Sequence, residues 1–382
     1  MLEKKSPLVL INSGEDSEFY YATRFLTHDP ALYIRFSPGD DLLVLNVMEV
    51  ERGRQSSTAK RVIDRAEHGW EDGDDPHRAW ARLAARLLRE KNISRVAVSP
   101  RLPAGYYEEL RGQDVELEID RQLFISERRR KSAEEADWIH GAQRAAEAAV
   151  AEAIGLLGTS EERGGELWLD DRPLTSERLM AAAQTVLNEI GYSCDDMIVA
   201  GSPKCAMPHF RGEGQIRANA PVIIDIFPRG RVSRYHGDLT RTVVVGSVPD
   251  GVRKMHEAVV AALDGALRMI RPGVTGRAVN DEVCRILKER GYGAAYPGFE
   301  APKGVPQMIH STGHGVGLDV HELPNLRPVD VALEEGDVVT VEPGLYLEGT
   351  GGVRVEDTGL VTATGFRNFT SISKSLDPRA YM

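Results

Sequence analysis

The segment VIIDIFPRGRVSRYHGDLTRTVVV (residues 222–245) has the form of a β-hairpin. Its two ends are apolar and β-branched, and its middle contains the proline, glycine and serine that favour a turn. If that turn centres on Arg231 and Val232, antiparallel pairing places Asp225 opposite Asp238. The sequence therefore predicts two carboxylates that face each other on one side of a β-ribbon.

A second hairpin of the same form, VVTVEPGLYLEGTGGVRVEDTGLV, spans residues 338–361. The stretch EGTGG supplies its turn, because glycine adopts positive φ without a steric cost. A turn centred on Gly349 places Glu342 opposite Glu356. We therefore expect a second pair of facing carboxylates in the same half of the chain.

The two carboxylate pairs together suggest a metal site. Like charges that stand opposite each other destabilise a sheet, and buried carboxylates without partners are costly. A solvated face would account for one such pair, whereas two pairs flanked by apolar runs favour cations between them. Four carboxylates and one imidazole can hold two divalent ions that share a bridging water or hydroxide. Oxygen-rich ligands favour manganese, iron, cobalt or zinc over copper.

Three histidines lie between the hairpins in HSTGHGVGLDVHE, residues 310–322. One of them is expected to complete the metal site. A pair at positions i and i+4 of a helix is a common zinc arrangement, which would suit His310 and His314. The interleaved glycines oppose a helix in this stretch, however. The pattern therefore favours one histidine ligand over two.

Composition restricts the class of protein. The 382 residues exceed one typical core and predict about two domains, and 42% hydrophobic with 27% charged residues are typical of globular proteins. The formal net charge of −11 argues against nucleic acid and against an anionic membrane as partners. Three cysteines without a Cys-x-x-Cys pair argue against a disulfide framework. The first residues hold no apolar run long enough for a signal peptide or membrane span, so we expect a cytoplasmic protein.

Residues 1–128 combine short apolar runs with one amphipathic helix, which predicts a smaller α/β domain. The expected strands are those at residues 7–11, 31–36, 42–48 and 95–100. The helix is expected to begin after Asp75, a favoured N-cap residue, with Pro76 in its first position.

Residues 129–382 are expected to form the larger domain. The basic run at 128–131 has the composition of a linker. Ser132 and Glu135 then form a capping-box sequence that opens a long helix.

The order helix, helix, strands is expected twice between residues 132 and 361, which suggests a duplication of elements without a sequence repeat. A second helix is predicted at 176–191, with a loop or small excursion at 162–175 before it.

Four motifs occur in the order DIFPRGRVSRYHGDLTRT, HSTGHGVGLDVHE, TVEPGLY and GGVRVEDT. In order and spacing they resemble the pita-bread metallopeptidases, in particular the prolidase and Xaa-Pro aminopeptidase branch. The resemblance covers residues 130–365, whereas residues 1–128 resemble the creatinase/prolidase N-terminal domain in length, position and α/β character. It implies an α+β fold in which a pita-bread (creatinase/aminopeptidase-like) catalytic domain follows that smaller domain.

The resemblance also implies roles for single residues. It implies that five residues are the metal ligands: Asp225, Asp238, His314, Glu342 and Glu356. They would hold two divalent ions, with manganese expected and cobalt, zinc or iron as alternatives.

The resemblance places further residues around the substrate. Glu342 would carry a proton from the attacking hydroxide to the leaving amine. His321 and His209 would bind substrate and stabilise the transition state. His310 would line the substrate pocket, and Arg354 would order the site through ion pairs. Purely structural roles remain alternatives for His209, His310 and Arg354.

The predicted activity is hydrolysis of the peptide bond between an N-terminal residue and proline, through a metal-bridging hydroxide. The sequence leaves open whether the protein is an Xaa-Pro aminopeptidase or an Xaa-Pro dipeptidase. Alternatives are a metal-free creatinase-like C–N hydrolase and a non-catalytic pita-bread binding protein. The complete ligand set argues against both alternatives. A peptide is the expected substrate, and the resemblance implies a homodimer.

Overall fold

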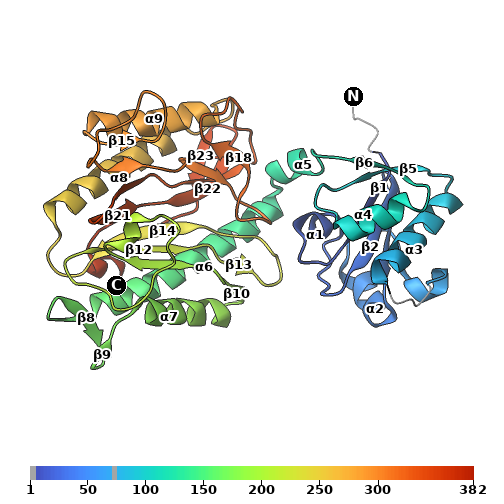
Figure 1. Cartoon of the computed structure of the whole chain (residues 1–382), viewed down its shortest axis with the longest axis horizontal. Coiled ribbons are helices and arrows are strands. Elements are labelled where there is room, and N and C mark those ends of the chain that lie inside the picture. The colour runs from blue at the N-terminus through green and yellow to red at the C-terminus, as the bar shows by residue number, and fades with distance from the viewer. Residues whose placement is uncertain (1–5, 71–74) are drawn as a thin grey trace. The chain divides into compact units, whose positions relative to one another are not determined.

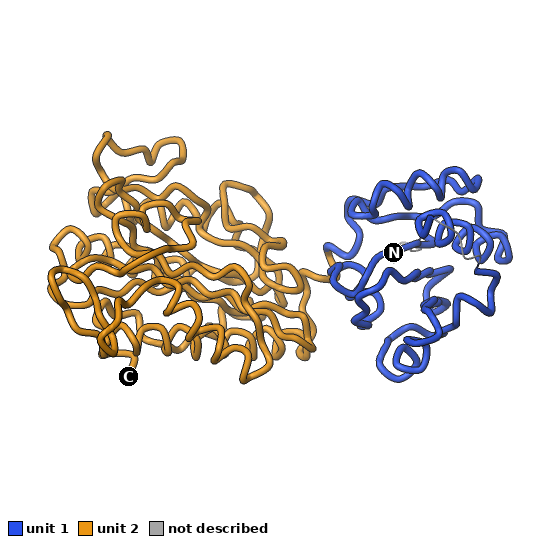
Figure 2. The backbone as a smooth tube through the Cα atoms, turned by 60° about the horizontal axis from the view of Figure 1, so that its bottom comes forward, with its two compact units in different colours: residues 1–125 blue, residues 126–382 orange. Residues whose placement is uncertain are grey.

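The computed structural model describes residues 6–70 and 75–382. Residues 1–5, which belong to the segment expected to lack a targeting sequence, lie outside the described residues. The chain divides into two compact units, Met1–Ile125 and Ser126–Met382, which Figure 2 shows in different colours. This division lies close to the boundary expected from the sequence.

The first unit is built around one mixed sheet covered by helices. Its strands are β1 (Leu8–Asn12), β2 (Ala31–Ser37), β3 (Asp40–Leu45), β4 (Val62–Asp64), β5 (Arg95–Val98) and β6 (Glu116–Ile119). Its helices are α1 (Ser17–Thr23), α2 (Val47–Ser56), α3 (Pro76–Glu90) and α4 (Ala104–Arg111), with the 3-10 turn η1 (Arg65–His68). The strand order is β4-β3-β2-β1-β5-β6. Side chains alternate along β1: Val9 and Ile11 pack with α3 and α4, whereas Leu8 and Leu10 pack with α1 and α2.

Two local predictions for this unit have different outcomes. Helix α3 begins as predicted, because the Asp75 carboxylate accepts a hydrogen bond from the N–H of His77 at 2.9 Å. The strand expected at residues 42–48 is too long, since β3 ends at Leu45. Val47 instead begins α2, where its side chain is 72% exposed. Its hydrophobicity therefore did not indicate burial in the sheet.

The second unit places two helix pairs on opposite sides of its strands, with α6 and α7 on one side and α8 and α9 on the other (Figure 1). The helices from the unit boundary onward are α5 (Ile125–Arg129), α6 (Ala133–Gly158), α7 (Ser176–Glu189), α8 (Asp250–Met269) and α9 (Gly276–Glu289), with the 3-10 turns η2 (Lys204–Ala206) and η3 (Pro378–Tyr381). The strands of the first half are β7 (Glu161–Arg163), β8 (Glu166–Leu169), β9 (Arg172–Pro173), β10 (Tyr192–Ser193), β11 (Ile198–Gly201), β12 (Pro221–Ile226), β13 (Arg229–Gly230) and β14 (Leu239–Val244). Those of the second half are β15 (Gly293–Ala294), β16 (Gln307–Met308), β17 (Gly313–Gly315), β18 (Glu322–Leu326), β19 (Val338–Val341), β20 (Gly344–Leu347), β21 (Gly351–Arg354), β22 (Asp357–Thr362) and β23 (Gly365–Asn368).

Each half of this unit has its own apolar core. Helices α6 and α7 pack against the sheet β11-β12-β14, and α8 and α9 pack against the sheets β15-β16-β20-β21 and β18-β17-β19-β22-β23. The predicted recurrence of helix, helix, strands is confirmed. The halves join along their strands, where the N–H of Glu356 donates to the carbonyl of Thr240 at 3.1 Å.

The first hairpin is present, but its predicted register is wrong. Strands β12 and β14 pair so that Asp225 stands opposite Thr240, two positions from the expected partner Asp238. The connection is centred later than expected, because its tip contains β13, which pairs with β10. Since side chains alternate along a strand with a period of two, a shift of two positions keeps both aspartates on one face.

The second hairpin has the predicted register. Gly344 pairs with Arg354 in one sheet and Val341 pairs with Asp357 in the other, so Glu342 and Glu356 hold opposed positions at the junction of the two sheets. Gly349 at the turn adopts φ +78°, a conformation that side chains rarely allow.

A loop or small excursion was expected at residues 162–175. This stretch contains most of a small antiparallel sheet, β7-β8-β9. Leu167 and Leu174 are fully buried with the core under α6 and α7. The N–H of Leu167 also donates to the carbonyl of Ile216 at 2.9 Å. Leu167 and Leu174 therefore anchor this excursion to the core.

The basic run at 128–131 was expected to be a linker, and this prediction is wrong. Arg128 and Lys131 both donate to Glu322, at 2.5 and 2.7 Å, and the Lys131 side chain is only 1% exposed. These buried ion pairs fix the run to the second unit. Their shared partner, Glu322, directly follows His321 in the chain.

The next two observations, on disulfides and on membrane-spanning helices, concern the described residues only. All cysteines are free and buried. Within residues 6–70 and 75–382, no helix combines the length and apolar character needed to cross a bilayer.

Candidate metal centre

A cavity of about 730 Å³ lies in the second unit, lined by all the site residues predicted from the sequence. These residues are His209, Asp225, Asp238, His310, His314, His321, Glu342, Arg354 and Glu356. The carboxylates come from the ends of the hairpin strands, and three of the histidines come from the glycine-rich stretch between the hairpins. Segments far apart in the sequence therefore meet at one site.

The geometry of the cavity suits a cation. Asp238, His314 and Glu356 are buried, and each offers one ligand atom within 4.8 Å of the others. The Nε2 atom of His314 lies 3.6 Å from Oδ2 of Asp238 and 3.6 Å from Oε1 of Glu342. Imidazole and carboxylate groups at this spacing match the ligands that divalent transition metals take.

Backbone packing orients His314. Its strand β17 lies between β18 and β19. A Cβ atom on Gly313 would stand 2.1 Å from the carbonyl oxygen of Thr340, so only glycine allows the strands to approach this closely. The Nδ1 atom of His314 lies 3.2 Å from the carbonyl of Gly315, which leaves Nε2 for the carboxylates. The expectation that no helix forms here is confirmed.

Arg354 holds one oxygen of Asp225 and leaves the other open. Its guanidinium donates to Oδ2 of Asp225 at 2.5 Å, to Oη of Tyr346 at 2.7 Å and to Oγ1 of Thr240 at 3.2 Å. Among the described residues, Oδ1 of Asp225 is buried and has no hydrogen-bond partner. A buried unpaired oxygen is unfavourable, and a bound cation would satisfy it.

The carboxylates raise one another's pKa. Burial, followed by repulsion from Glu356, Asp225 and Glu342, raises the pKa of Asp238 well above its usual range. Burial, followed by repulsion from Glu342 and Asp225, does the same for Glu356. Burial is also the main cause that raises the pKa of Glu342 to about 8, against the opposing effect of Arg354. Divalent ions would neutralise these charges and favour the ionised carboxylates that ligation requires.

The histidines differ in their partners. Burial lowers the pKa of His314 to about 3, so its ring is neutral, as a metal ligand must be. Burial also lowers the pKa of His310 to about 4. His310 Nδ1 lies 2.8 Å from the carbonyl of Ser311, and its Nε2 lies 2.8 Å from Oη of Tyr346. Both ring nitrogens of His310 therefore have protein partners.

His321 lies against His314, with 4.2 Å between ring centroids in an edge-on arrangement. Burial, followed by repulsion from His209, lowers the pKa of His321. Both rings line the cavity.

Sequence reasoning missed the polar residues that support the ligands. Thr240 Oγ1 donates to Oε2 of Glu356 at 2.8 Å, and Tyr346 connects His310 to Arg354. Both residues lie inside the quoted motifs DLTRT and TVEPGLY. Their position inside a motif was the available signal, but their partners depend on tertiary contacts.

Two helix–helix–sheet halves around a buried cluster of carboxylates and histidine define a pita-bread fold with a candidate metal centre. The chain belongs to metallopeptidase family M24, whose model matches residues 137–363.

Relatives with a related sequence include an Xaa-Pro dipeptidase of Lactobacillus delbrueckii subsp. lactis, 28% identical over 380 residues, with 93% of this chain and 91% of that protein covered. An Xaa-Pro dipeptidase of Pyrococcus furiosus is 37% identical over 183 residues, which cover 47% of this chain and 49% of that protein. The chain thus matches about half the length of this archaeal relative.

Solved structures extend the similarity to both units. The prolidase from Pyrococcus horikoshii OT3 superposes with a TM-score of 0.78 at 26% identity, covering 97% of this chain and 95% of that chain. The Xaa-Pro dipeptidase from Bacillus anthracis superposes with a TM-score of 0.81 at 25% identity, covering 97% and 94%.

Proposed function

We propose that the protein is a metal-dependent exopeptidase that hydrolyses the bond between an N-terminal residue and proline. The observation that carries this proposal is the convergence of the predicted ligands Asp225, Asp238, His314, Glu342 and Glu356 on one cavity. The names of the relatives, Xaa-Pro dipeptidase and prolidase, support the substrate class.

These five residues would hold two divalent ions, with manganese proposed and cobalt, zinc or iron as alternatives. The unpaired Oδ1 of Asp225 supports a cation at this position. When bound, such ions lower the pKa of a water molecule and polarise the substrate carbonyl.

The protein groups around the ions would handle protons and charge. Glu342 directs Oε1 toward His314 and Oε2 toward His310, at 3.6 and 3.9 Å, so its two oxygens face two different histidines. From there its carboxylate would accept a proton from water and release it to the leaving amine. His321 and His209 would donate hydrogen bonds to the charge that develops on the scissile carbonyl.

Arg354 and His310 would orient the site. Arg354 holds Asp225 in place, and Tyr346 holds His310 at the cavity wall. A hydrogen-bonded ring at the wall presents a fixed surface to the substrate, which favours one bound orientation.

Arg211 would bind the free carboxylate of a dipeptide. Among the described residues that line the cavity, the arginines are Arg211 and Arg354, and Arg354 is already bonded to Asp225 and Tyr346. The Arg211 side chain is 68% exposed and pairs with Asp196, another residue of the cavity lining. An arginine fork matches a carboxylate, so Arg211 favours the dipeptidase over the aminopeptidase.

We also propose that the protein is a homodimer and lies in the cytoplasm. These two proposals rest on the family resemblance and on the absence of disulfides among the described residues. A metal-free creatinase-like reaction is disfavoured because the five ligand positions keep metal-binding residue types.

One assay on the full chain tests the proposal. Metal-stripped protein is supplied with manganese, cobalt or zinc and offered Ala-Pro, a longer Xaa-Pro peptide, a Met-Ala peptide and creatine. We expect metal-dependent cleavage of the Xaa-Pro peptides. Asp238→Asn should abolish this cleavage, whereas Asp330→Asn, a matched change in an exposed ion pair, should retain it. Failure of every metal to support cleavage of any peptide would contradict the proposal.

A further inference from the structure

The main chain of Asp238 is hydrogen-bonded by two side chains that do not line the cavity. Its N–H donates to Oε1 of Gln143 at 2.8 Å, and its carbonyl accepts a hydrogen bond from Oγ1 of Thr358 at 2.8 Å. Gln143 lies on α6 and is fully buried. Both polar groups of this peptide segment are therefore satisfied by side chains, which restricts the direction of the Asp238 carboxylate.

Gln143 is itself held by the C-terminal segment. Its Nε2 donates to Oγ1 of Thr370 at 3.0 Å, and the same oxygen accepts the N–H of Thr358 at 3.0 Å. Both residues that hold Asp238 therefore donate to one hydroxyl oxygen of the residues that follow β23, Gln143 through its side chain and Thr358 through its main chain.

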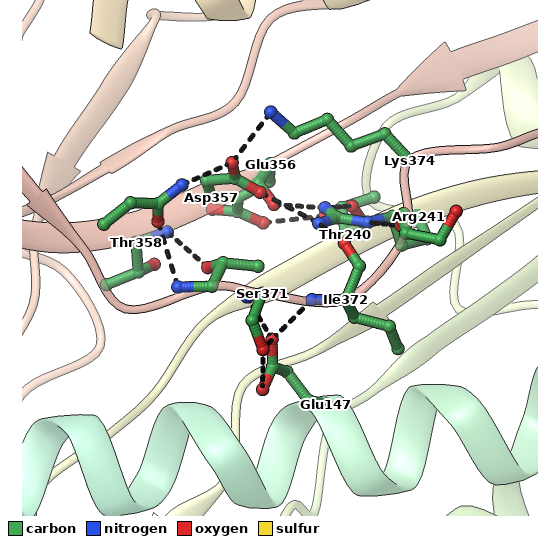
Figure 3. A network of polar contacts seen from close by, with 12 residues as sticks. Glu147, Thr240, Arg241, Glu356, Asp357, Thr358, Ser371, Ile372 and Lys374 are labelled. Atoms are coloured by element: carbon green, nitrogen blue, oxygen red, sulfur yellow. Dashed lines mark hydrogen bonds and ion pairs between the residues drawn. The ribbon is translucent and has the colours of Figure 1, made fainter. Parts of the chain in front are cut away.

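Arg241 holds the main chain of Glu356 in the same way, as Figure 3 shows. Its guanidinium is fully buried and donates to the carbonyl of Glu356 at 2.5 Å and to Oδ1 of Asp357 at 2.9 Å. It also donates to the carbonyl of Ser373 at 2.6 Å. One arginine thus connects a predicted metal ligand to the C-terminal segment.

We call residues 368–374 the C-terminal strap; it lies beyond residues 137–363, which the family model matches. Glu147 of α6 accepts the N–H groups of Ser371 and Ile372 at 2.5 and 2.8 Å (Figure 3). Lys374 pairs with Oδ2 of Asp357 at 3.1 Å. The strap is therefore fastened to α6 at one point and to β22 at another.

We propose that the C-terminal strap is part of the metal centre. It acts through Gln143 and Arg241, which are positioning residues for Asp238 and Glu356, and thereby sets the affinity for divalent metal. This inference rests on the proposed function, because it takes Asp238 and Glu356 as ligands. Its physical basis is that partners of ligand residues fix ligand orientation, and their loss lowers metal affinity roughly 10–100-fold.

The test compares manganese binding by metal-stripped full-length variants, measured by titration calorimetry. Gln143→Met removes both hydrogen bonds at similar volume, and we expect its Kd to rise roughly 10–100-fold. Glu147→Ala loosens the strap at a distance from the cavity, so its Kd should rise by a smaller factor. Glu147→Gln keeps an acceptor oxygen and should restore affinity toward the wild-type value.

Glu177→Ala is the matched control, because Glu177 of α7 accepts the N–H of Gly214 at 2.9 Å and does not contact the strap. It should bind manganese as the wild type does, and the thermal midpoint of each apo variant shows how far stability alone accounts for any change. Unchanged affinity in Gln143→Met and Glu147→Ala, or an equal loss in Glu177→Ala, would overturn the inference. A wild type that binds manganese but cleaves no Xaa-Pro peptide would contradict the proposed function alone, and the affinities would still decide the role of the strap.

Discussion

Arg354 donates a 2.5 Å hydrogen bond to Oδ2 of Asp225, while Oδ1 of the same carboxylate is buried without a partner among the described residues. The arginine thereby holds one carboxylate oxygen and leaves the other available to a cation. The same guanidinium donates to Oη of Tyr346 at 2.7 Å, so its fork connects Asp225 to Tyr346.

Replacing Arg354 by lysine should disrupt this arrangement. A lysine ammonium keeps the charge but lacks the planar fork that reaches Asp225 and Tyr346 together. A lost hydrogen bond to a charged group costs about 1.5–3 kcal/mol, so kcat/KM for Ala-Pro should fall roughly 10- to 150-fold. Steady-state kinetics check this, with Arg277→Lys in an exposed ion pair as the control. Unchanged kinetics in Arg354→Lys would show that the fork has no role.

Metal removal should destabilise the protein. Crowded carboxylates with raised pKa are relieved by a bound cation, and a ligand present at 100 times its Kd stabilises the folded state by about 2.7 kcal/mol. For a unit of this size, the unfolding midpoint should rise roughly 5–10 °C on adding manganese. Calorimetric scans with and without metal measure the shift. Asp238→Asn should show a much smaller rise, and a wild type without any shift would speak against the metal centre.

Glu322→Gln should cost far more stability than its position at the end of the short strand β18 suggests. Glu322 pairs with Arg128 and Lys131, and the three side chains are only 9%, 12% and 1% exposed. The substitution removes the carboxylate that the buried Lys131 pairs with, whereas Arg128 keeps Asp319 at 2.8 Å. Breaking a buried ion pair by removing one partner costs about 3–5 kcal/mol. Denaturant unfolding followed by circular dichroism gives the value.

The control for Glu322→Gln is Asp330→Asn, which breaks an exposed pair with Arg277 and should leave the free energy of unfolding nearly unchanged. Equal stabilities of the two variants would contradict the importance of the buried network. Because Glu322 follows His321, a lower kcat in Glu322→Gln would also be expected.

Arg211→Ala should separate substrates by their C-terminal group. If Arg211 binds the dipeptide carboxylate, KM for Ala-Pro should rise while KM for Ala-Pro amide stays constant. Lys204→Ala is a suitable control, since its exposed ammonium pairs with Glu213 and does not line the cavity. A parallel rise of KM for the acid and the amide would assign carboxylate binding to another group.

The predictions made from sequence succeeded where a side chain's environment follows from local chemistry. The glycines around Gly349 mark the second turn, so the register that opposes Glu342 and Glu356 could be predicted. In the first hairpin the proline and glycine precede the observed centre of the connection, so the predicted centre is wrong. The alternation of side chains still kept Asp225 and Asp238 on one face, because an error of two positions does not change the face.

The same limits explain the misassigned segments. The basic composition around Arg128 and Lys131 predicts a linker. This prediction is wrong because nothing nearby in the chain identifies Glu322 as their partner. The apolar run that includes Val47 and Met48 predicts a strand, whereas both residues lie exposed at the start of α2. A distant contact decided the structure of the first segment, and the absence of a burying contact decided that of the second.

The sequence by itself determined the residue types of the candidate metal centre, its two hairpins and the duplicated order of helices and strands. These properties follow from hydrophobic period, turn residues and charge, which act over short distances along the chain. Only the tertiary structure decided which groups hold the ligands in place. Gln143 reaches Asp238, and Arg241 reaches Glu356 and the C-terminal strap, across long separations in sequence. Such hydrogen bonds depend on the packing of whole elements, and no local pattern encodes them.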